Sequence, residues 1–409
     1  MNCRFCGKIL THEFIDLGNA PPSNAFLTRD QLNEPELFYP LKLYVCDFCF
    51  LVQIDEYKKS IDIFDSGYVY FSSFSSTWLA HAKQYTDMMI EKYRYNQDSR
   101  IIEIASNDGY LLQYFKEKGI PSLGIEPAEG TAVEARKKGI ETIVDFFGKR
   151  LAQSLADQGK KADLLIGNNV LAHVPDLNDF ISGLKIALKP TGIITMEFPH
   201  LMQLVDNCQF DTIYHEHFSY LSFMTVQSIF KKHGLELFDV EELPTHGGSL
   251  RIFAKHAEDL TRIISENVNA LLKKEMSRGI NMMAYYQNFH KKADQVKYDL
   301  LNFLIEQRKN NKKVAAYGAA AKGNTLLNYC GVRKDLIDFV VDASPHKQGK
   351  YLPGSHITVV SEQEIKKYKP DYVLIFPWNI KEEIMAQLDY IRAWGGKFVI
   401  PIPHIKLIS

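Results

Sequence analysis

Short apolar runs alternate with longer amphipathic stretches along the middle of this chain. The predicted elements alternate strand and helix in the order 100–104, 111–117, 122–125, 132–138, 142–144, 162–166, 177–188 and 192–197. Strands that alternate with helices are typical of a parallel sheet with helices on both faces. We therefore predict a doubly wound α/β domain, which we place at residues 67–256.

The alternation stops after this domain and resumes near the C-terminal end. Residues 257–310 contain few turn-forming residues and predict a connector of long helices. Further elements are predicted at 313–317, 322–329, 336–341, 372–376 and 397–400. They indicate a second α/β domain over residues 311–409.

Four cysteines near the start of the chain form two C-x-x-C pairs, Cys3 with Cys6 and Cys46 with Cys49. Two such pairs most often make a tetrahedral thiolate zinc site. A redox-active C-x-x-C is the alternative, but it does not explain why there are two pairs. Because a site of four thiolates has no open coordination position, we expect residues 1–66 to form a module that holds structural zinc.

The charge and hydropathy of the chain narrow its range of partners. The 409 residues carry 48 Lys and Arg against 49 Asp and Glu, a formal net charge of -1. Such a chain has no global field that attracts nucleic acid or anionic lipid. No apolar run approaches the roughly 18–20 residues of a membrane span, and the first residues lack the apolar stretch of a signal peptide. We expect a cytoplasmic protein that contacts neither nucleic acid nor membrane.

Two acidic residues stand at the ends of neighbouring predicted strands, Glu103 before a turn of small residues and Glu126 before Pro127. Ligands of open α/β sheets bind at the carboxyl ends of the strands, so both acids face one crevice. An acid at the end of the second strand can accept hydrogen bonds from ribose hydroxyls. The spacing suits a dinucleotide or S-adenosylmethionine. The absence of a G-x-G-x-x-G motif favours S-adenosylmethionine, which has no phosphates.

The segment from Glu103 to Gly109 resembles the E-x-G-x-G-x-G motif of class I methyltransferases, with Ala105 and Asn107 replacing the first two glycines. The run 167–176 looks like the segment after their fourth strand. Together with the zinc knuckles, these motifs resemble the sugar C-methyltransferases that act on nucleotide-linked 4-keto-6-deoxy sugars. The resemblance spans nearly the whole chain.

This resemblance implies a class I methyltransferase fold for the central domain and a Rossmann-like fold for the C-terminal domain. It places Asp145 and Phe146 where such folds meet the adenine. The implied S-adenosylmethionine contacts are Glu103, Ala105, Asn107, Gly109, Tyr110, Glu126, Pro127, Asp145, Phe146 and Asn168.

The run Tyr214-His-Glu-His-Phe-Ser-Tyr220 concentrates ionisable and phenolic side chains. Such a group can supply a base, a partner that orients it and donors for an oxyanion. A metal site is an alternative, but H-E-H is not H-E-x-x-H, and in an extended segment His215 and His217 share one face with Glu216 on the other. Polar loop residues, or core histidines with satisfied hydrogen bonds, are the other alternative.

Methylation of a carbon beside a ketone needs a base for the C3 proton and stabilisation of the charge on the C4 oxygen. The resemblance implies that His217 is this base, with Glu216 and Tyr214 as its acid–base and hydrogen-bonding partners. It also implies that the keto-sugar meets Tyr70, Asn169 and His173, and His246 is a further candidate because its neighbouring glycines allow close backbone approach.

The run 314–325 predicts a strand, a turn of small residues and the start of a helix. Free N–H groups at a helix N-terminus bind phosphate, and Lys322 can add a full charge. Close packing of the helix on the strand is the alternative. The resemblance assigns this domain to the nucleotide sugar, with candidate contacts from Lys322, Asn324, Asp342 and Lys347.

The sequence thus predicts an enzyme of three parts that methylates C3 of a nucleotide diphosphate 4-keto-6-deoxyhexose. Methylation of a sugar oxygen or nitrogen is one alternative, although it needs less acid–base machinery than residues 214–217 offer. A non-catalytic binding protein with a relic methyltransferase fold is another, and the replacements at Ala105 and Asn107 favour it. We expect a monomer, because two α/β domains in one chain can enclose the substrate.

Overall fold

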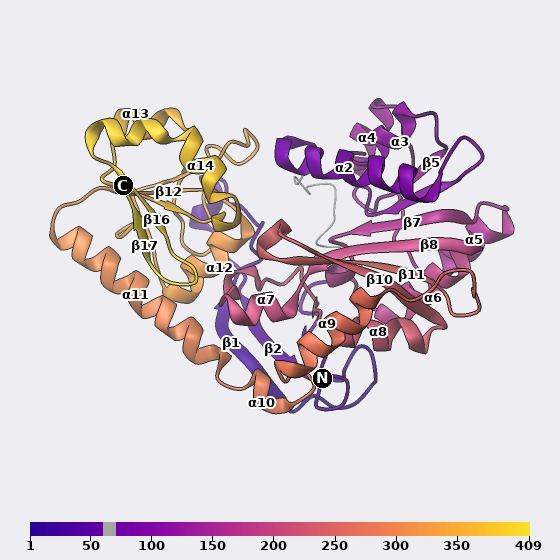
Figure 1. Ribbon diagram of the computed structural model, residues 1–409. Helices are drawn as coiled ribbons and strands as arrows, with labels where there is room; N and C mark the ends of the chain where they lie inside the picture. The colour runs from indigo at the N-terminus through magenta and orange to yellow at the C-terminus, as the bar shows by residue number, and fades with distance from the viewer. Residues whose placement is uncertain (60–70) are drawn as a thin grey trace.

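The computed structural model describes residues 1–59 and 71–409, and the strands of these residues form three sheets (Figure 1). The N-terminal sheet has the order β1 (His12–Ala20), β2 (Tyr39–Val45), β3 (Val52–Ile54) and β9 (Ser219–Tyr220), with antiparallel pairing throughout. Strand β9 comes from far along the chain, and its Tyr220 pairs with Val52. The N-terminal module is therefore joined by backbone hydrogen bonds to the segment that follows His217.

The central sheet has the order β10-β11-β8-β7-β4-β5-β6, and all of its strands except β11 run parallel. Its strands are β4 (Ile101–Ile104), β5 (Ser122–Ile125), β6 (Glu141–Ile143), β7 (Ala162–Asn168), β8 (Leu188–Pro199), β10 (Leu235–Leu243) and β11 (Ser249–His256). Its helices are α2 (Ser76–Tyr93), α3 (Leu112–Glu117), α4 (Glu129–Lys137), α5 (Lys149–Asp157), α6 (Leu177–Ala187), α7 (Leu201–Asp206) and α8 (Phe223–Lys232).

Successive residues of β4 pack on opposite faces of this sheet because side chains alternate along a strand. Ile102 and Ile104 join a core cluster with residues of α5, α6 and α8. Ile101 joins another cluster with residues of α2 and α3. Both faces are therefore covered, which confirms the predicted doubly wound α/β fold.

The connector contains α9 (Glu266–Ser277), α10 (Met283–Tyr286) and α11 (Phe289–Lys309), and α11 leads to the C-terminal domain (Figure 1). The C-terminal sheet has the order β14 (Val359–Val360), β13 (Val340–Val341), β12 (Val314–Tyr317), β15 (Tyr372–Ile375), β16 (Lys397–Ile400) and β17 (Lys406–Ile408), parallel apart from β17. Its helices are α12 (Ala321–Cys330), α13 (Gln363–Tyr368) and α14 (Lys381–Gln387). This is the Rossmann-like arrangement that the sequence predicts.

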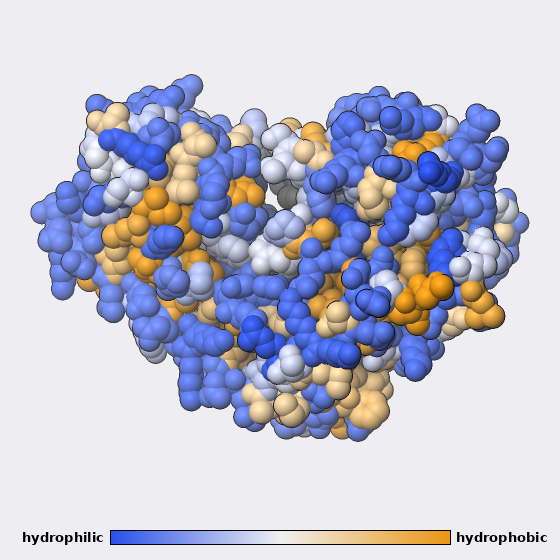
Figure 2. Space-filling model, in the orientation of Figure 1, coloured by the Kyte–Doolittle hydropathy of each residue, from blue (hydrophilic) through white to orange (hydrophobic). Residues whose placement is uncertain are grey.

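A shared core holds the C-terminal domain against the rest of the molecule. One cluster contains Phe14 of β1, Leu201 of α7, Leu300 of α11 and Leu326 of α12. Above this core the surface is indented between the lobe of α13 and α14 and the lobe of α2 and α4 (Figures 1 and 2). No helix among the described residues is long and apolar enough to cross a membrane.

Candidate active site

A cavity of about 1230 Å³ lies where the central sheet, the N-terminal module and the C-terminal domain meet. Its walls include Asn24 of the N-terminal module, Trp78 of α2, Asn168 at the end of β7 and Lys322 of α12. Most of the predicted site residues line it, namely Ala105, Asn107, Tyr110, Glu126, Pro127, Asp145, Phe146, Asn168, Asn169, His173, Tyr214, Glu216, His217, His246, Lys322 and Lys347. The fold therefore brings predicted site residues from distant segments of the sequence together around one cavity.

The turn after β4 keeps the backbone shape of a glycine-rich motif although two glycines are replaced. Ala105 has a φ of 56° and Asn107 a φ of 50°, both in the left-handed region. Asparagine adopts this conformation readily, whereas for alanine it costs about 1–2 kcal/mol. Backbone strain of this kind persists at functional sites when the surrounding structure imposes it. The replacements therefore do not argue for a relic fold.

The acid at the end of β5 is engaged with the neighbouring backbone. Glu126 accepts hydrogen bonds from the backbone N–H groups of Asn107 and Ala128, both at 2.9 Å. Burial raises the pKa of Glu126, and these two donors oppose that shift. Each carboxylate oxygen has a further lone pair, so Glu126 can still accept hydrogen bonds from the hydroxyl groups of a ribose.

Two residues of the predicted cofactor motif do not line the cavity. Glu103 is fully buried within β4, and burial raises the pKa of its carboxyl group well above the ordinary value. Gly109 packs against the end of α4, where an added Cβ would lie 2.4 Å from Cδ1 of Ile140. With a φ of 75° as well, Gly109 is needed for this close packing.

The remaining crevice residues fit an adenosyl ligand with a charged amino acid tail. The amide of Asn168 is buried at the cavity wall and interacts with the phenol of Tyr110. Phe146 is 40% exposed at the cavity wall and presents a ring on which a base can stack. Beside it, Asp145 forms an ion pair with Arg150 at 2.5 Å. A side-chain amide has two donors and an acceptor, so Asn168 can also bond to a ligand in the cavity.

His217 is held as a neutral imidazole. Its Nδ1 lies 3.0 Å from the carbonyl oxygen of Thr212, which can only accept, so Nδ1 carries the proton and Nε2 keeps its lone pair. Burial lowers the pKa of His217 well below the usual value, and the nearby His173, His246 and Lys322 lower it further. The tautomer and the charge state therefore both suit a proton acceptor.

Two more imidazoles lie near His217. The ring of His173 packs edge-on against His217 with 4.7 Å between centroids. His246 has a left-handed φ of 53°, and its Nε2 accepts a hydrogen bond from the side-chain amide of Asn169 at 3.1 Å. Burial lowers the pKa values of His173 and His246 to about 4, so both are neutral at pH 7.

Residues 214–217 form a turn, in contrast to the extended segment considered from the sequence. The backbone N–H of His217 donates to the carbonyl of Tyr214 at 3.0 Å. Glu216 and His217 consequently both line the cavity, while Nε2 of His215 lies 3.3 Å from the carbonyl of Pro40. The two histidines do not face a common metal, and the described residues hold no cluster of metal-binding side chains at this place.

Glu216 and Tyr214 flank His217. Burial raises the pKa of Glu216, and a hydrogen bond from the amide of Asn24 at 2.8 Å opposes the rise. The ring of Tyr214 lies 4.0 Å from that of His217, centroid to centroid. Asn24 was not predicted, because nothing in its local sequence distinguishes this loop residue from any other.

The predicted nucleotide-sugar contacts of the C-terminal domain divide into residues that line the cavity and residues that do not. Lys322 and Lys347 line the cavity. Asp342 pairs with Lys347 at 3.3 Å and lies outside the cavity wall. Asn324 is buried, and its amide donates to the carbonyl of Ser23 at 2.6 Å, so it fastens α12 to the N-terminal module. Tyr70 lies outside the described residues.

The four paired cysteines converge as the sequence predicts. Their sulfur atoms all lie within 4.8 Å of one another, and the Cys3–Cys49 and Cys6–Cys46 pairs are 3.5 Å apart. Four sulfurs at about 2.3 Å from a tetrahedral zinc ion would be about 3.8 Å apart. The amide of Gln53 donates to Sγ of Cys3 at 3.2 Å, as an outer-sphere partner would. The donor set therefore fits zinc.

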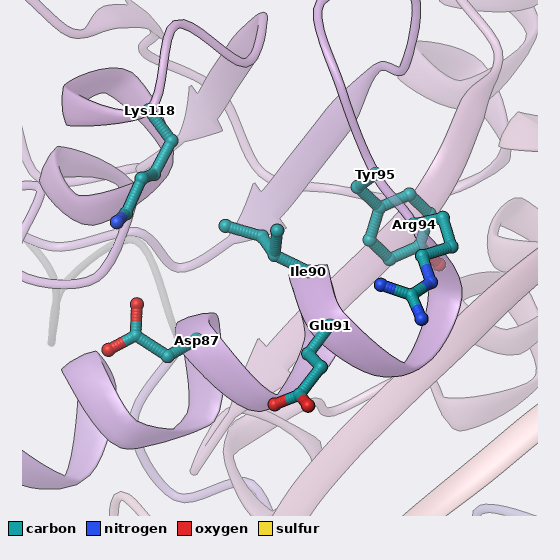
Figure 3. Close-up of a pocket in the computed structure, with 6 residues that line it drawn as sticks. All are labelled: Asp87, Ile90, Glu91, Arg94, Tyr95 and Lys118. Atoms are coloured by element: carbon teal, nitrogen blue, oxygen red, sulfur yellow. The ribbon is translucent and has the colours of Figure 1, made fainter.

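A separate, open depression of about 420 Å³ lies between the end of α2 and the end of α3 (Figure 3). Its lining residues are Asp87, Ile90, Glu91, Arg94, Tyr95 and Lys118. It shares no lining residue with the large cavity and contains none of the predicted site residues.

A doubly wound sheet with one antiparallel strand beside β8, and a ligand crevice at the ends of β4, β5 and β7, defines a class I methyltransferase. Family models agree with this class along the chain. They match residues 3–64 as "Putative zinc binding domain", residues 65–240 as "Methyltransferase domain" and residues 244–403 as "C-methyltransferase C-terminal domain".

The protein C-methyltransferase NovU of Streptomyces niveus is 32% identical to this chain over 407 residues, which cover 100% of this chain and 96% of NovU. This chain therefore belongs to the C-methyltransferase family. An O-methyltransferase of ubiquinone biosynthesis from Chelativorans is 30% identical over 96 residues, 23% of this chain and 38% of that protein. The crystal structure of the PH0226 protein from Pyrococcus horikoshii matches 46% of this chain and 94% of its own, with a TM-score of 0.37 and 15% identity.

Proposed function

We propose that this methyltransferase uses S-adenosylmethionine to methylate C3 of a nucleotide diphosphate 4-keto-6-deoxyhexose. The observation that carries the proposal is the neutral His217, whose proton on Nδ1 is fixed by Thr212 and which lines the same cavity as the cofactor crevice. Transfer to an oxygen or nitrogen needs less acid–base machinery, because a proton on carbon beside a ketone is a weaker acid than a hydroxyl proton and its removal also leaves charge on the C4 oxygen.

The cofactor contacts follow from the crevice. We assign the adenosyl part to Glu126, Asp145 and Phe146, and the amino acid tail to Asn168 and the backbone of Ala105 and Asn107. S-adenosylmethionine supplies an electrophilic methyl group when bound. The left-handed turn lines the cavity at Ala105 and Asn107, so its backbone is available to the ligand.

The acid–base step belongs to residues 214–217. In the proposal, Nε2 of His217 takes the C3 proton of the sugar, and hydrogen-bond donors at the cavity wall stabilise the charge that develops on the C4 oxygen. Tyr214 and Asn169 are the candidate donors, and His173 restricts the ring of His217 by edge-on packing. Glu216, oriented by Asn24, is a second acid–base group.

The nucleotide diphosphate is assigned to the side of the cavity formed by the C-terminal domain. Lys322 stands in the first turn of α12, so its charge adds to the free N–H groups of the helix start. Lys347 lines the same wall. Both cations can pair with phosphate oxygens, and the uncharged sugar is left for the base.

The zinc ion is proposed to be structural, held by Cys3, Cys6, Cys46 and Cys49. We propose domain boundaries at 1–66 for the zinc module, 67–256 for the methyltransferase domain, 257–310 for the connector and 311–409 for the C-terminal domain. We propose a monomeric enzyme, because the N-terminal module, the central sheet and the C-terminal domain of a single chain can together enclose a substrate.

The proposal is tested by incubating the protein with S-adenosylmethionine and a panel of TDP-, GDP- and CDP-linked 4-keto-6-deoxyhexoses. Mass spectrometry follows methylation, and NMR locates the new methyl group. We expect a methyl group on C3 of at least one sugar. A methyl group on oxygen or nitrogen would contradict the reaction type. Binding of S-adenosylmethionine with no methylated sugar would contradict the acceptor class.

A further inference from the structure

Trp378 of the C-terminal domain contacts three segments of the site at once. It begins the short helix η6 (Trp378–Ile380), which follows β15 after Phe376 and Pro377. Its indole N–H donates to Oδ2 of Asp211 at 2.7 Å, and Nζ of Lys322 lies 4.4 Å from the centre of its ring. A Cβ built on Gly247 would lie 2.4 Å from Cη2 of Trp378, so the ring packs directly on that backbone.

Asp211 accepts this hydrogen bond from a buried position. The carboxyl group is 1% exposed, and its Oδ1 has no hydrogen-bond partner among the described residues. Burial raises the pKa of Asp211 to about 6, although the charge of Lys322 and the indole N–H oppose the rise. Backbone N–H groups of Asp211 and Thr212 also interact with this carboxyl group, and the indole N–H is the donor that links it to the C-terminal domain.

Asp211 in turn belongs to the segment that holds the proposed base. It lies in the short helix η4 (Phe210–Thr212), and the next residue is Thr212, whose carbonyl accepts from Nδ1 of His217. The hydroxyl of Thr325 in α12 also donates to the carbonyl of Ile213 at 2.7 Å. The C-terminal domain therefore forms hydrogen bonds with the residues on both sides of Thr212, namely Asp211 and Ile213.

The second contact concerns the turn that carries His246. The turn is η5 (Thr245–Gly247), and the amide of Gln209 donates to the carbonyl of Gly247 at 2.7 Å. Gly247 has a φ of 88° and lies against the Trp378 ring, so the turn rests on the indole. The ring thus lies between the segment of the base and the turn of His246.

We propose that Trp378 is a positioning residue, which fixes the imidazole of His217 relative to the sugar by holding Asp211 and the turn 245–247. The inference rests on the proposed role of His217 as the base. It gives the C-terminal domain a part in proton abstraction that is separate from its part in nucleotide binding. A displacement of about 1 Å at a reacting group can lower a rate about 100-fold, so a remote indole can have a large effect.

The test compares Trp378→Phe with Trp394→Phe, which removes another indole N–H bond of the same domain, to the carbonyl of Pro370 at 3.0 Å. The measurement is exchange of the C3 proton of the panel sugars into deuterated solvent, at saturating sugar. We expect Trp378→Phe to lower this rate by between about 10-fold and 100-fold. The KM for the sugar should not change, because the ring beneath Lys322 remains, and calorimetry should find S-adenosylmethionine affinity retained.

Two further variants separate positioning from a general structural role. Gly247→Ala pushes a methyl group against the indole, whereas Gly331→Ala at a φ of 71° meets no atom within 4 Å. We expect only Gly247→Ala to slow exchange at equal thermal stability. Asp211→Asn keeps an acceptor for the indole and should exchange faster than Asp211→Ala. Equal rates for the two Asp211 variants would contradict the positioning role.

The outcomes distinguish this inference from the proposed function. If His217→Gln abolishes exchange and Trp378→Phe exchanges as fast as Trp394→Phe, the positioning role is wrong and the base stands. If His217→Gln retains exchange, the base assignment itself is wrong. A readout without substrate is the NMR signal of the Nδ1 proton of His217, which Trp378→Phe should shift or broaden. An unchanged signal would overturn the inference.

Discussion

Removal of the proposed zinc ion from the cysteine cluster should unfold the N-terminal module and disable the active site together. Without zinc, sulfur atoms as close as 3.5 Å would have to coexist as thiols or thiolates. Two thiolates at that distance repel by about 5 kcal/mol at an effective dielectric constant of about 20. Structural zinc contributes about 10–16 kcal/mol, which is comparable to the whole stability of a typical domain.

We expect the loss of zinc to displace the proposed base, His217, through the N-terminal sheet. Gln53 donates to Sγ of Cys3 and pairs with Ser219 in β9. Strand β9 begins two residues after His217. Loosening of the cluster therefore frees the segment that carries the proposed base, and methylation should disappear along with the structure of the module.

The assay combines metal analysis, thermal unfolding and methylation. Protein purified without added zinc should contain close to one zinc ion per chain. Chelation should lower the melting temperature by more than about 10 °C, since each kcal/mol corresponds to roughly 2–4 °C. Cys46→Ser should be insoluble, while Cys208→Ser and Cys330→Ser, outside the cluster, should fold. A metal-free protein that melts and methylates normally would refute this reasoning, and an iron–sulfur absorbance band would refute the choice of metal.

Three further predictions concern stability, pH and cofactor affinity. Glu275 is fully buried and accepts from Nε2 of His200 and from the backbone N–H groups of Phe223 and Met224, at 2.7–2.8 Å. Glu275→Ala should cost about 3–5 kcal/mol in urea unfolding, whereas Leu260→Ala, at a residue 89% exposed, should cost little; equal midpoints would contradict the role of this network. Because burial lowers the pKa of His217 well below 6.5, the proposed base stays unprotonated at pH 6.5, and kcat should fall only as the pH drops through that lowered value. A fall that begins above pH 7 would contradict this assignment. Phe146→Ala should weaken S-adenosylmethionine binding by about 10-fold in calorimetry, since stacking of a base on an aromatic ring contributes about 1–3 kcal/mol, and unchanged affinity would remove Phe146 from the adenine site.

Local sequence patterns predicted the elements of the central sheet well, because its strands are short, apolar and buried on both faces. The strand predicted at 122–125 is β5. The strand predicted at 192–197 extends over Leu188–Pro199, since Pro190 and Gly192 resemble a turn in the sequence but lie within β8. The run 336–341 contributes only Val340–Val341 to the C-terminal sheet. Only these two residues pair in register with residues of the neighbouring strands β12 and β14, and the choice of neighbouring strands is not visible in the local sequence.

The parts of the site that the sequence could not reveal depend on contacts between distant segments. The cluster at 214–217 was visible as a local concentration of ionisable residues, but the turn that directs His215 away from the cavity was not. Asp211, Trp378 and Asn24 have no distinctive local pattern, and their roles arise only when the domains pack together. Pairing of β9 with β3 is of the same kind, because two residues carry too little information to specify a partner strand.

The central claim, that His217 is the base of a carbon methylation, is tested most directly by exchange of the C3 proton of a nucleotide-linked 4-keto-6-deoxyhexose into deuterated solvent. The control is His215→Gln, because His215 is buried beside the site but lies against Pro40. The account predicts exchange in the wild type and in His215→Gln, and none in His217→Gln, which should still bind S-adenosylmethionine. Exchange retained in His217→Gln would contradict it.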